Sequence, residues 1–266
     1  MHGRHALSEA GHVLGTVSRY PLAVTRHAAR RGLEHTLWVV ADRWNHFVVI
    51  GMYHPDSRFD HRRLLLGSTW RQRRDMVIYA TVDLLRRELT DWGVGGAVAE
   101  VGVCRGTFAA RLNQYFPERT LYLFDTFAGF DARDVAAEAA RGRGGEPYSL
   151  PEVTVEEVRS RLPHPEKAEF RVGWFPESAR GCEDETFCLV NVDVGLYQPT
   201  HAALQWFYPR LAAGGYLLVT DYNNAHCPGV REAVHQFARE VEIAYTVLPD
   251  YGARAVIAKP RPVDEA

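Results

Sequence analysis

Two acidic residues and one histidine follow apolar segments late in the chain, where they could take a proton from a reacting group. Asp193 ends the segment "TFCLVNVD", Asp221 ends "GYLLVTD", and His226 lies in the following stretch "NNAHCPG". A carboxylate or a neutral imidazole beside a hydroxyl or an amine can act as a general base. We therefore take Asp193, Asp221 and His226 as the candidate catalytic residues.

A second set of residues has the spacing of a nucleoside-binding turn. The segment "EVGVCRGTF" contributes Glu100, Gly102, Gly106 and Thr107, and Asp125 follows Gly102 by 23 positions. An acid at this distance, at the end of the next strand, can accept hydrogen bonds from both hydroxyls of a ribose. The turn reads Glu-x-Gly-x-x-x-Gly and lacks the Gly-x-Gly-x-x-Gly of dinucleotide sites, which makes a nicotinamide-dependent dehydrogenase the weaker alternative. We predict a nucleoside ligand.

These candidate residues follow predicted strands that alternate with predicted helices. The strands are expected at 97–102, 120–125, 168–173, 186–193 and 215–221, and the helices at 76–89, 107–115, 154–161, 200–211 and 229–241. This alternation predicts an α/β fold with a doubly wound, mostly parallel sheet, to which a closing hairpin around 250–252 adds an antiparallel strand. Ligands of such sheets bind beyond the carboxyl ends of the strands.

Composition and charge narrow the class of partner. The 46% hydrophobic content is that of a globular protein. The four cysteines show no Cys-x-x-Cys spacing, and we expect reduced thiols in a cytoplasmic protein. No apolar run reaches the length of a membrane span, and no basic stripe is interleaved with aromatics, so we expect neither a membrane nor a nucleic-acid partner. Residues 1–75 hold twelve Arg against six acidic residues, which indicates either a solvated basic cap docked on an acidic body or a surface for a small, anionic acceptor.

Six motifs occur in order between about residue 75 and residue 259. They are "AEVGVCRGTFA", "LFDTFAGF", "VGWFPES", "DVGLYQPT", "FYPRLAAGGYLLVTDYNN" and "GVREAVHQF". Together they resemble the macrocin O-methyltransferase-like family of class I S-adenosylmethionine-dependent methyltransferases. The resemblance implies a seven-stranded Rossmann-like sheet, S-adenosylmethionine as cofactor, O-methylation of a sugar or another small natural-product or glycan acceptor, and self-association. It leaves 1–68 as a helical cap, lid or dimerisation region, before a methyltransferase domain at 69–260 and a tail at 261–266.

The resemblance also implies roles for the matching positions. The methionine part of the cofactor would lie against the glycine turn, the ribose against the acid at 125, and the adenine near the aromatic pair of "VGWF". The implied cofactor-binding residues are Glu100, Gly102, Gly106, Thr107, Asp125, Thr126, Phe127, Trp174, Phe175 and Asp193. Asp193 is included because it could bind the amino group of the cofactor instead of acting as a base.

The motif around Asp193 departs from the family pattern. The family usually has Asp-x-Asp-Leu-Tyr, whose second Asp helps to bind a divalent cation, and often His or Asp before the later Asp-Tyr; this chain has Gly195 and Thr220 there. Because hard cations prefer several carboxylate oxygens, Asp193, Asp221 and Asn223 could hold Mg²⁺ only weakly. Gly195 thus indicates a lost metal or space for a bulkier acceptor. N-methylation, another reaction and a non-catalytic binding protein stay open as alternatives.

Overall fold

The computed structural model describes residues 76–143, 153–250, 252 and 254–261, so the region predicted at 1–68 lies outside the described residues. The sheet consists of β1 (Ala97–Val101), β2 (Leu121–Asp125), β3 (Ala168–Val172), β4 (Phe187–Val192), β5 (Leu211–Val219), β6 (Thr246–Val247) and β7 (Ala255–Ala258). Their order is β3-β2-β1-β4-β5-β7-β6. The first five strands pair in parallel, and β7 is antiparallel to β5 and β6. The predicted fold class is confirmed.

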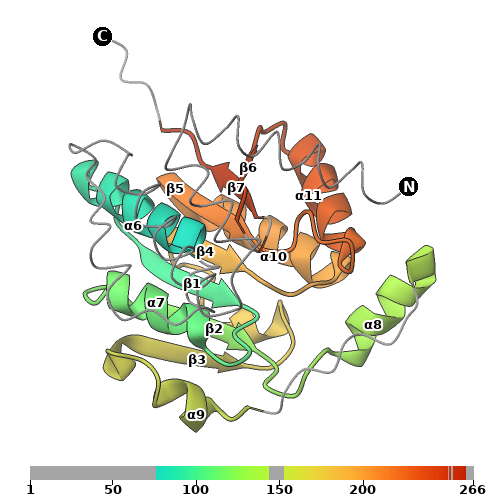
Figure 1. Ribbon diagram of the computed structural model, residues 1–266, viewed down its shortest axis with the longest axis horizontal. Coiled ribbons are helices and arrows are strands. Elements are labelled where there is room, and N and C mark those ends of the chain that lie inside the picture. The colour runs from blue at the N-terminus through green and yellow to red at the C-terminus, as the bar shows by residue number, and fades with distance from the viewer. Residues whose placement is uncertain (1–75, 144–152, 251, 253, 262–266) are drawn as a thin grey trace, which may run out of the picture. The chain divides into compact units, whose positions relative to one another are not determined.

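The helices are α6 (Met76–Asp91), α7 (Thr107–Tyr115), α8 (Ala132–Glu138), α9 (Val155–Arg159), α10 (Tyr197–Arg210) and α11 (Pro228–Glu240), with short turns η1 (Ala139–Arg143), η2 (Pro165–Lys167) and η3 (Glu177–Ala179). Helices α6, α7 and α10 contact strands of the sheet, whereas α8 extends away from it and contacts α10 (Figure 1). Side chains alternate along β1, and Ala97, Ala99 and Val101 join the core formed with α10 and α11. Glu100 therefore faces the other side of the sheet. Within the described part of the chain, no helix has both the length and the apolar character of a membrane span.

Local sequence signals set several helix ends. Thr154 caps α9: its hydroxyl accepts a hydrogen bond from the backbone N–H of Glu157, and the Glu157 carboxylate accepts one from the backbone N–H of Thr154. This is the capping box that the sequence predicts. Helix α10 was expected to begin at 200 and instead begins at Tyr197. The reason is a contact distant in sequence, because the backbone N–H of Tyr197 donates to Glu138 at the end of α8 at 3.0 Å.

The end of β5 also differs from the prediction. The strand was expected to run to 221, but it ends at Val219. Asp221 has a left-handed φ of 62°, and its backbone N–H donates to the carbonyl of Gly252 at 2.8 Å. A residue in this region cannot continue a strand. The chain therefore turns away at the position where the sequence suggested a second acid at a strand end.

Candidate functional site

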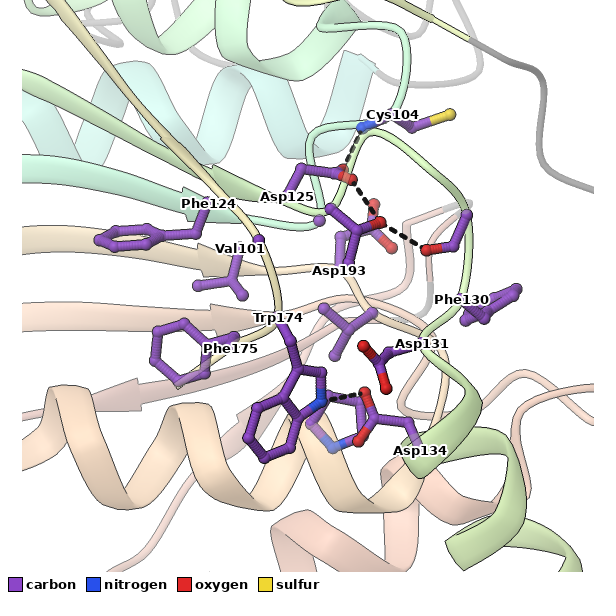
Figure 2. A pocket seen from close by; sticks show the side chains of 16 residues that line it. Val101, Cys104, Phe124, Asp125, Phe130, Asp131, Asp134, Trp174, Phe175 and Asp193 are labelled. Atoms are coloured by element: carbon purple, nitrogen blue, oxygen red, sulfur yellow. Dashed lines mark hydrogen bonds between the residues drawn. The ribbon is translucent and has the colours of Figure 1, made fainter. Parts of the chain in front are cut away.

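A cavity of about 270 Å³ opens at the carboxyl ends of β1, β2 and β4 (Figure 2). The strand order reverses between β1 and β4, which makes this the switch point where open α/β sheets bind ligands. The cavity brings together six of the residues predicted from the sequence: Gly102, Asp125, Thr126, Trp174, Phe175 and Asp193.

The carboxylate of Asp125 stabilises the turn that follows β1 by accepting hydrogen bonds from its backbone. Its Oδ2 accepts hydrogen bonds from the backbone N–H groups of Val103 at 2.7 Å and Cys104 at 2.9 Å, and its Oδ1 accepts one from Phe127 at 2.8 Å. Cys104 and Phe127 both have positive φ, so these bonds hold two unfavourable backbone conformations. Each carboxylate oxygen has two lone pairs, and Asp125 is only half-buried, so a ligand hydroxyl could still reach it.

The two glycines of the turn are required for different reasons. Gly102 has φ +86°, and a Cβ there would lie 2.0 Å from the backbone oxygen of Asp193, so a glycine lets the turn pack against the end of β4. Gly106 has φ +71°, and its Cβ would lie 2.5 Å from Cγ1 of Val158 on α9. The second glycine is thus needed for contact with a helix. Thr107, the first residue of α7, is exposed.

An acid that the sequence did not predict lies on the wall of this cavity. Asp134, on α8, accepts a hydrogen bond from the indole Nε1 of Trp174 at 2.9 Å (Figure 2). Its other oxygen, Oδ1, is buried and has no hydrogen-bond partner within the described part of the chain. Burial raises the pKa of Asp134 to about 6, and the bond from Trp174 opposes that rise. A buried acceptor left open beside a cavity suits a donor group on a ligand.

Both aromatic residues predicted beside the adenine line the cavity, and Phe175 also belongs to the core. Trp174 is half-buried, and the guanidinium carbon of Arg133 lies 3.9 Å from its ring centroid. Phe175 is only 6% exposed and stacks on Phe207 of α10, with 5.6 Å between ring centroids. Phe127 is also half-buried and packs near Phe170 of β3, with centroids 6.2 Å apart.

Of the three candidate catalytic residues, Asp193 lines the cavity. Burial raises the pKa of Asp193 to about 7; neighbouring Asp221 raises it further, and Arg254 lowers it. Asp221 is outside the cavity lining, and its Oδ1 accepts a hydrogen bond from Asn224 at 3.0 Å. His226 is exposed on the following turn, also outside the lining, so its role stays a prediction.

Glu100 lies beneath the turn and is 1% exposed. Its Oε1 accepts a hydrogen bond from Asn191 Nδ2 at 3.1 Å, across the β1–β4 pair. Its Oε2 has no partner among the described residues, and burial raises the pKa of Glu100 well above its ordinary value. Glu100 is therefore a buried acid whose ionised form is disfavoured, beneath the turn that borders the cavity.

The sequence profile described as macrocin-O-methyltransferase (TylF) matches residues 57–249, which is most of the chain. The chain belongs to the macrocin O-methyltransferase family. Mycinamicin III 3''-O-methyltransferase of Micromonospora griseorubida is 32% identical to it over 159 residues, which cover 54% of this chain and 61% of that relative. The chain thus spans about three fifths of the length of that relative.

Two further comparisons agree with this family. The relative from Streptomyces olivaceus, 8-demethyl-8-(2,3-dimethoxy-alpha-L-rhamnosyl)-tetracenomycin-C 4'-O-methyltransferase, is 28% identical over 201 residues, covering 68% of this chain and 74% of that relative. Among solved structures, the O-methyltransferase NovP superposes with a TM-score of 0.58 at 23% identity, covering 70% of this chain and 81% of NovP. The chain therefore has the fold of class I methyltransferases.

Proposed function

We propose that this chain is an S-adenosylmethionine-dependent O-methyltransferase that acts on a sugar or another small natural-product or glycan acceptor. The observation that carries the proposal is the cavity beyond β1, β2 and β4, which Asp125 and Asp134 line, together with the buried Oδ1 of Asp134, which has no partner among the described residues. The family and the names of its relatives support it, one of which names a rhamnosyl group.

The cofactor would bind along this wall. Asp125 would receive the ribose hydroxyls, and Gly102 would let the methionine part approach the turn. The adenine would lie beside Trp174 and donate its amino group to Oδ1 of Asp134, the buried oxygen that otherwise has no partner in the described residues. That open acceptor is the feature that fits a nucleoside.

When bound, S-adenosylmethionine supplies an electrophilic methyl group on a sulfonium centre. The protein then has to align the acceptor oxygen and remove its proton. Asp193 is the candidate base, because it lines the cavity and has a pKa of about 7, which keeps much of it ionised at neutral pH. Self-association, a cytoplasmic location and an anionic acceptor belong to the same proposal and rest on the sequence.

Calorimetry with S-adenosylhomocysteine tests the cofactor part of the proposal. We expect binding to the wild type, and weaker binding of Asp125→Ala by on the order of 1.5–3 kcal/mol, because charge-assisted hydrogen bonds to the ribose are lost. Mass spectrometry of rhamnosylated acceptors incubated with S-adenosylmethionine tests the reaction, and fragmentation assigns the methyl group to oxygen or nitrogen. Binding of a nicotinamide nucleotide in place of S-adenosylhomocysteine would refute the proposal.

A further inference from the structure

A buried guanidinium lies at the end of β5, next to a position where the family resemblance implies a metal ligand. Arg254 precedes β7 and is 7% exposed. Its Nη1 forms a short ion pair with the Asp250 carboxylate, and its Nε donates to Oγ1 of Thr220 at 3.1 Å. Its guanidinium carbon also lies 5.3 Å from the ring centroid of Phe108 on α7. Arg254 therefore joins the ends of β5 and β7 beneath the helix that follows the glycine turn.

The guanidinium decides which group donates and which accepts in a series of buried hydrogen bonds. Arginine can only donate, so the Thr220 hydroxyl accepts from Arg254 and directs its own proton to Oδ1 of Asn191, at 3.4 Å. The Asn191 amide then presents its Nδ2 to Oε1 of Glu100 at 3.1 Å. Thr220, Asn191 and Glu100 are 5%, 0% and 1% exposed. This series of hydrogen bonds runs from the end of β5 across β4 to β1. It ends at Glu100, under the turn that borders the cavity.

A second set of contacts engages the other side-chain oxygens near β5 that could bind a metal ion. The Asp221 carboxylate accepts from Asn224 Nδ2 at 3.0 Å, with the thiol of Cys227 at 3.7 Å from its other oxygen. Asn223 is exposed, and its Oδ1 accepts from Arg231 at 3.3 Å. Gly195 is a buried residue with φ +66° and contributes no side chain.

These contacts leave a poor donor set for a divalent cation. Mg²⁺ needs near-octahedral oxygen coordination with carboxylate ligands. Of the positions that the resemblance implies, 195 has no oxygen in its side chain and 220 is committed to a guanidinium. In the part of the chain that the structure describes, no group of three or more His, Cys, Asp and Glu side chains could hold a metal ion. The residues present do not fit the cation of the family.

We propose that this member of the family does not use the divalent cation, and that Arg254 instead anchors Thr220 and, through Asn191, holds Glu100 beneath the cofactor turn. Arg254 and Thr220 are then positioning residues, since they act on the site through Glu100. The role of this series of hydrogen bonds in cofactor binding rests on the proposed function. The lack of a metal requirement does not rest on it.

Thermal unfolding and calorimetry of the wild type with MgCl₂ or MnCl₂, compared with EDTA, test the metal part. We expect the same Tm in all three conditions and no saturable heat of binding. A ligand that binds only the folded state would raise the Tm. A saturable rise in Tm with either metal that is lost in Asp193→Asn would overturn the proposal. This readout needs neither cofactor nor acceptor, so it stays informative if the proposed methyl transfer fails.

The pair Thr220→Val and Thr220→Ser tests the anchoring part. Valine keeps the shape but removes the hydroxyl that links Arg254 to Asn191, and serine keeps the hydroxyl. We expect Thr220→Val to weaken S-adenosylhomocysteine binding about tenfold, which corresponds to one hydrogen bond to a charged group, and Thr220→Ser to retain wild-type affinity. Circular dichroism selects the temperature at which both variants are folded. Equal affinities in the wild type and both variants would refute the anchoring role.

Discussion

Trp174 and Asp134, forty residues apart in sequence, share a hydrogen bond of 2.9 Å on the wall of the cavity. The bond uses Oδ2 of the carboxylate, and the buried Oδ1 has no hydrogen-bond partner within the described residues. Two consequences of this pairing can be measured, one on the stability of the protein and one on ligand affinity.

The substitution Asp134→Asn should stabilise the protein in a pH-dependent way. The pKa of Asp134 is raised from its ordinary value of 3.8 to about 6, so between these values the folded state holds a proton that the unfolded chain has lost. The wild type therefore loses stability as the pH rises through this window, by on the order of 1–3 kcal/mol. The variant can still accept the indole bond but does not ionise. Urea denaturation at pH 5 and pH 8 should show its advantage growing with pH; a constant difference would contradict this pKa.

The same substitution, Asp134→Asn, should weaken ligand binding although it stabilises the protein. If ionised Asp134 accepts the adenine amino group, S-adenosylhomocysteine should bind less tightly to the wild type below about pH 6, where the carboxylate is protonated. Asp134→Asn should bind more weakly and lose this pH dependence. Calorimetry across the same pH range measures both, and equal profiles for the two proteins would remove Asp134 from the adenine site.

Gly102 and Gly129, two of the glycines that line the cavity, allow the effect of backbone strain to be separated from that of a steric clash. Both have φ near +85°, but a Cβ at Gly102 would lie 2.0 Å from a backbone oxygen, whereas nothing lies within 4 Å of a Cβ at Gly129. We expect Gly129→Ala to cost about 1 kcal/mol from backbone strain alone. Gly102→Ala should cost about 2–4 kcal/mol and abolish cofactor binding, because the end of β4 must move. Chemical denaturation compares the two; equal losses would show that the collision is relieved cheaply.

Asp193 and His226 make different predictions for catalysis. Asp193 lines the cavity, and His226 is exposed outside the cavity lining. Asp193→Asn should lower kcat by about 10²–10⁴-fold, the range for loss of a general base, while His226→Gln should leave kcat unchanged. Steady-state kinetics with an accepted substrate measure both. A large loss in the histidine variant would mean that the turn carrying it moves over the cavity during the reaction.

Gly195 can be used to test whether its identity reflects a lost metal ligand. The residue has φ +66°, so both Gly195→Asp and Gly195→Asn should destabilise the fold by about 1 kcal/mol. Only the aspartate adds a carboxylate near Asp193. We therefore expect MgCl₂ to raise the Tm of that variant only. A rise of the same size in the asparagine variant would show a nonspecific salt effect, and none in either would show that side chains at 195 do not reach Asp193.

The sequence determined the local structure and the edge of the sheet at which the candidate site lies. Helix α7 runs over the residues predicted for it, and the capping box at Thr154 forms, because hydrogen bonds and steric preferences within a few residues decide such elements. Asp125 and Asp193 reach the cavity because the carboxyl ends of parallel strands meet at one edge.

Only the tertiary structure decided how that edge is completed. Asp134 faces Trp174, and Arg254 reaches Thr220, through contacts between segments 40 and 34 residues apart. Glu138 likewise moves the start of α10 to Tyr197, against the local signal at 200. Such partners leave no periodic or spacing signal, since their choice depends on how distant elements pack. The sequence therefore located the candidate site. Tertiary packing decided which of its carboxylates accept hydrogen bonds from the protein, which are buried, and which have an oxygen without a partner.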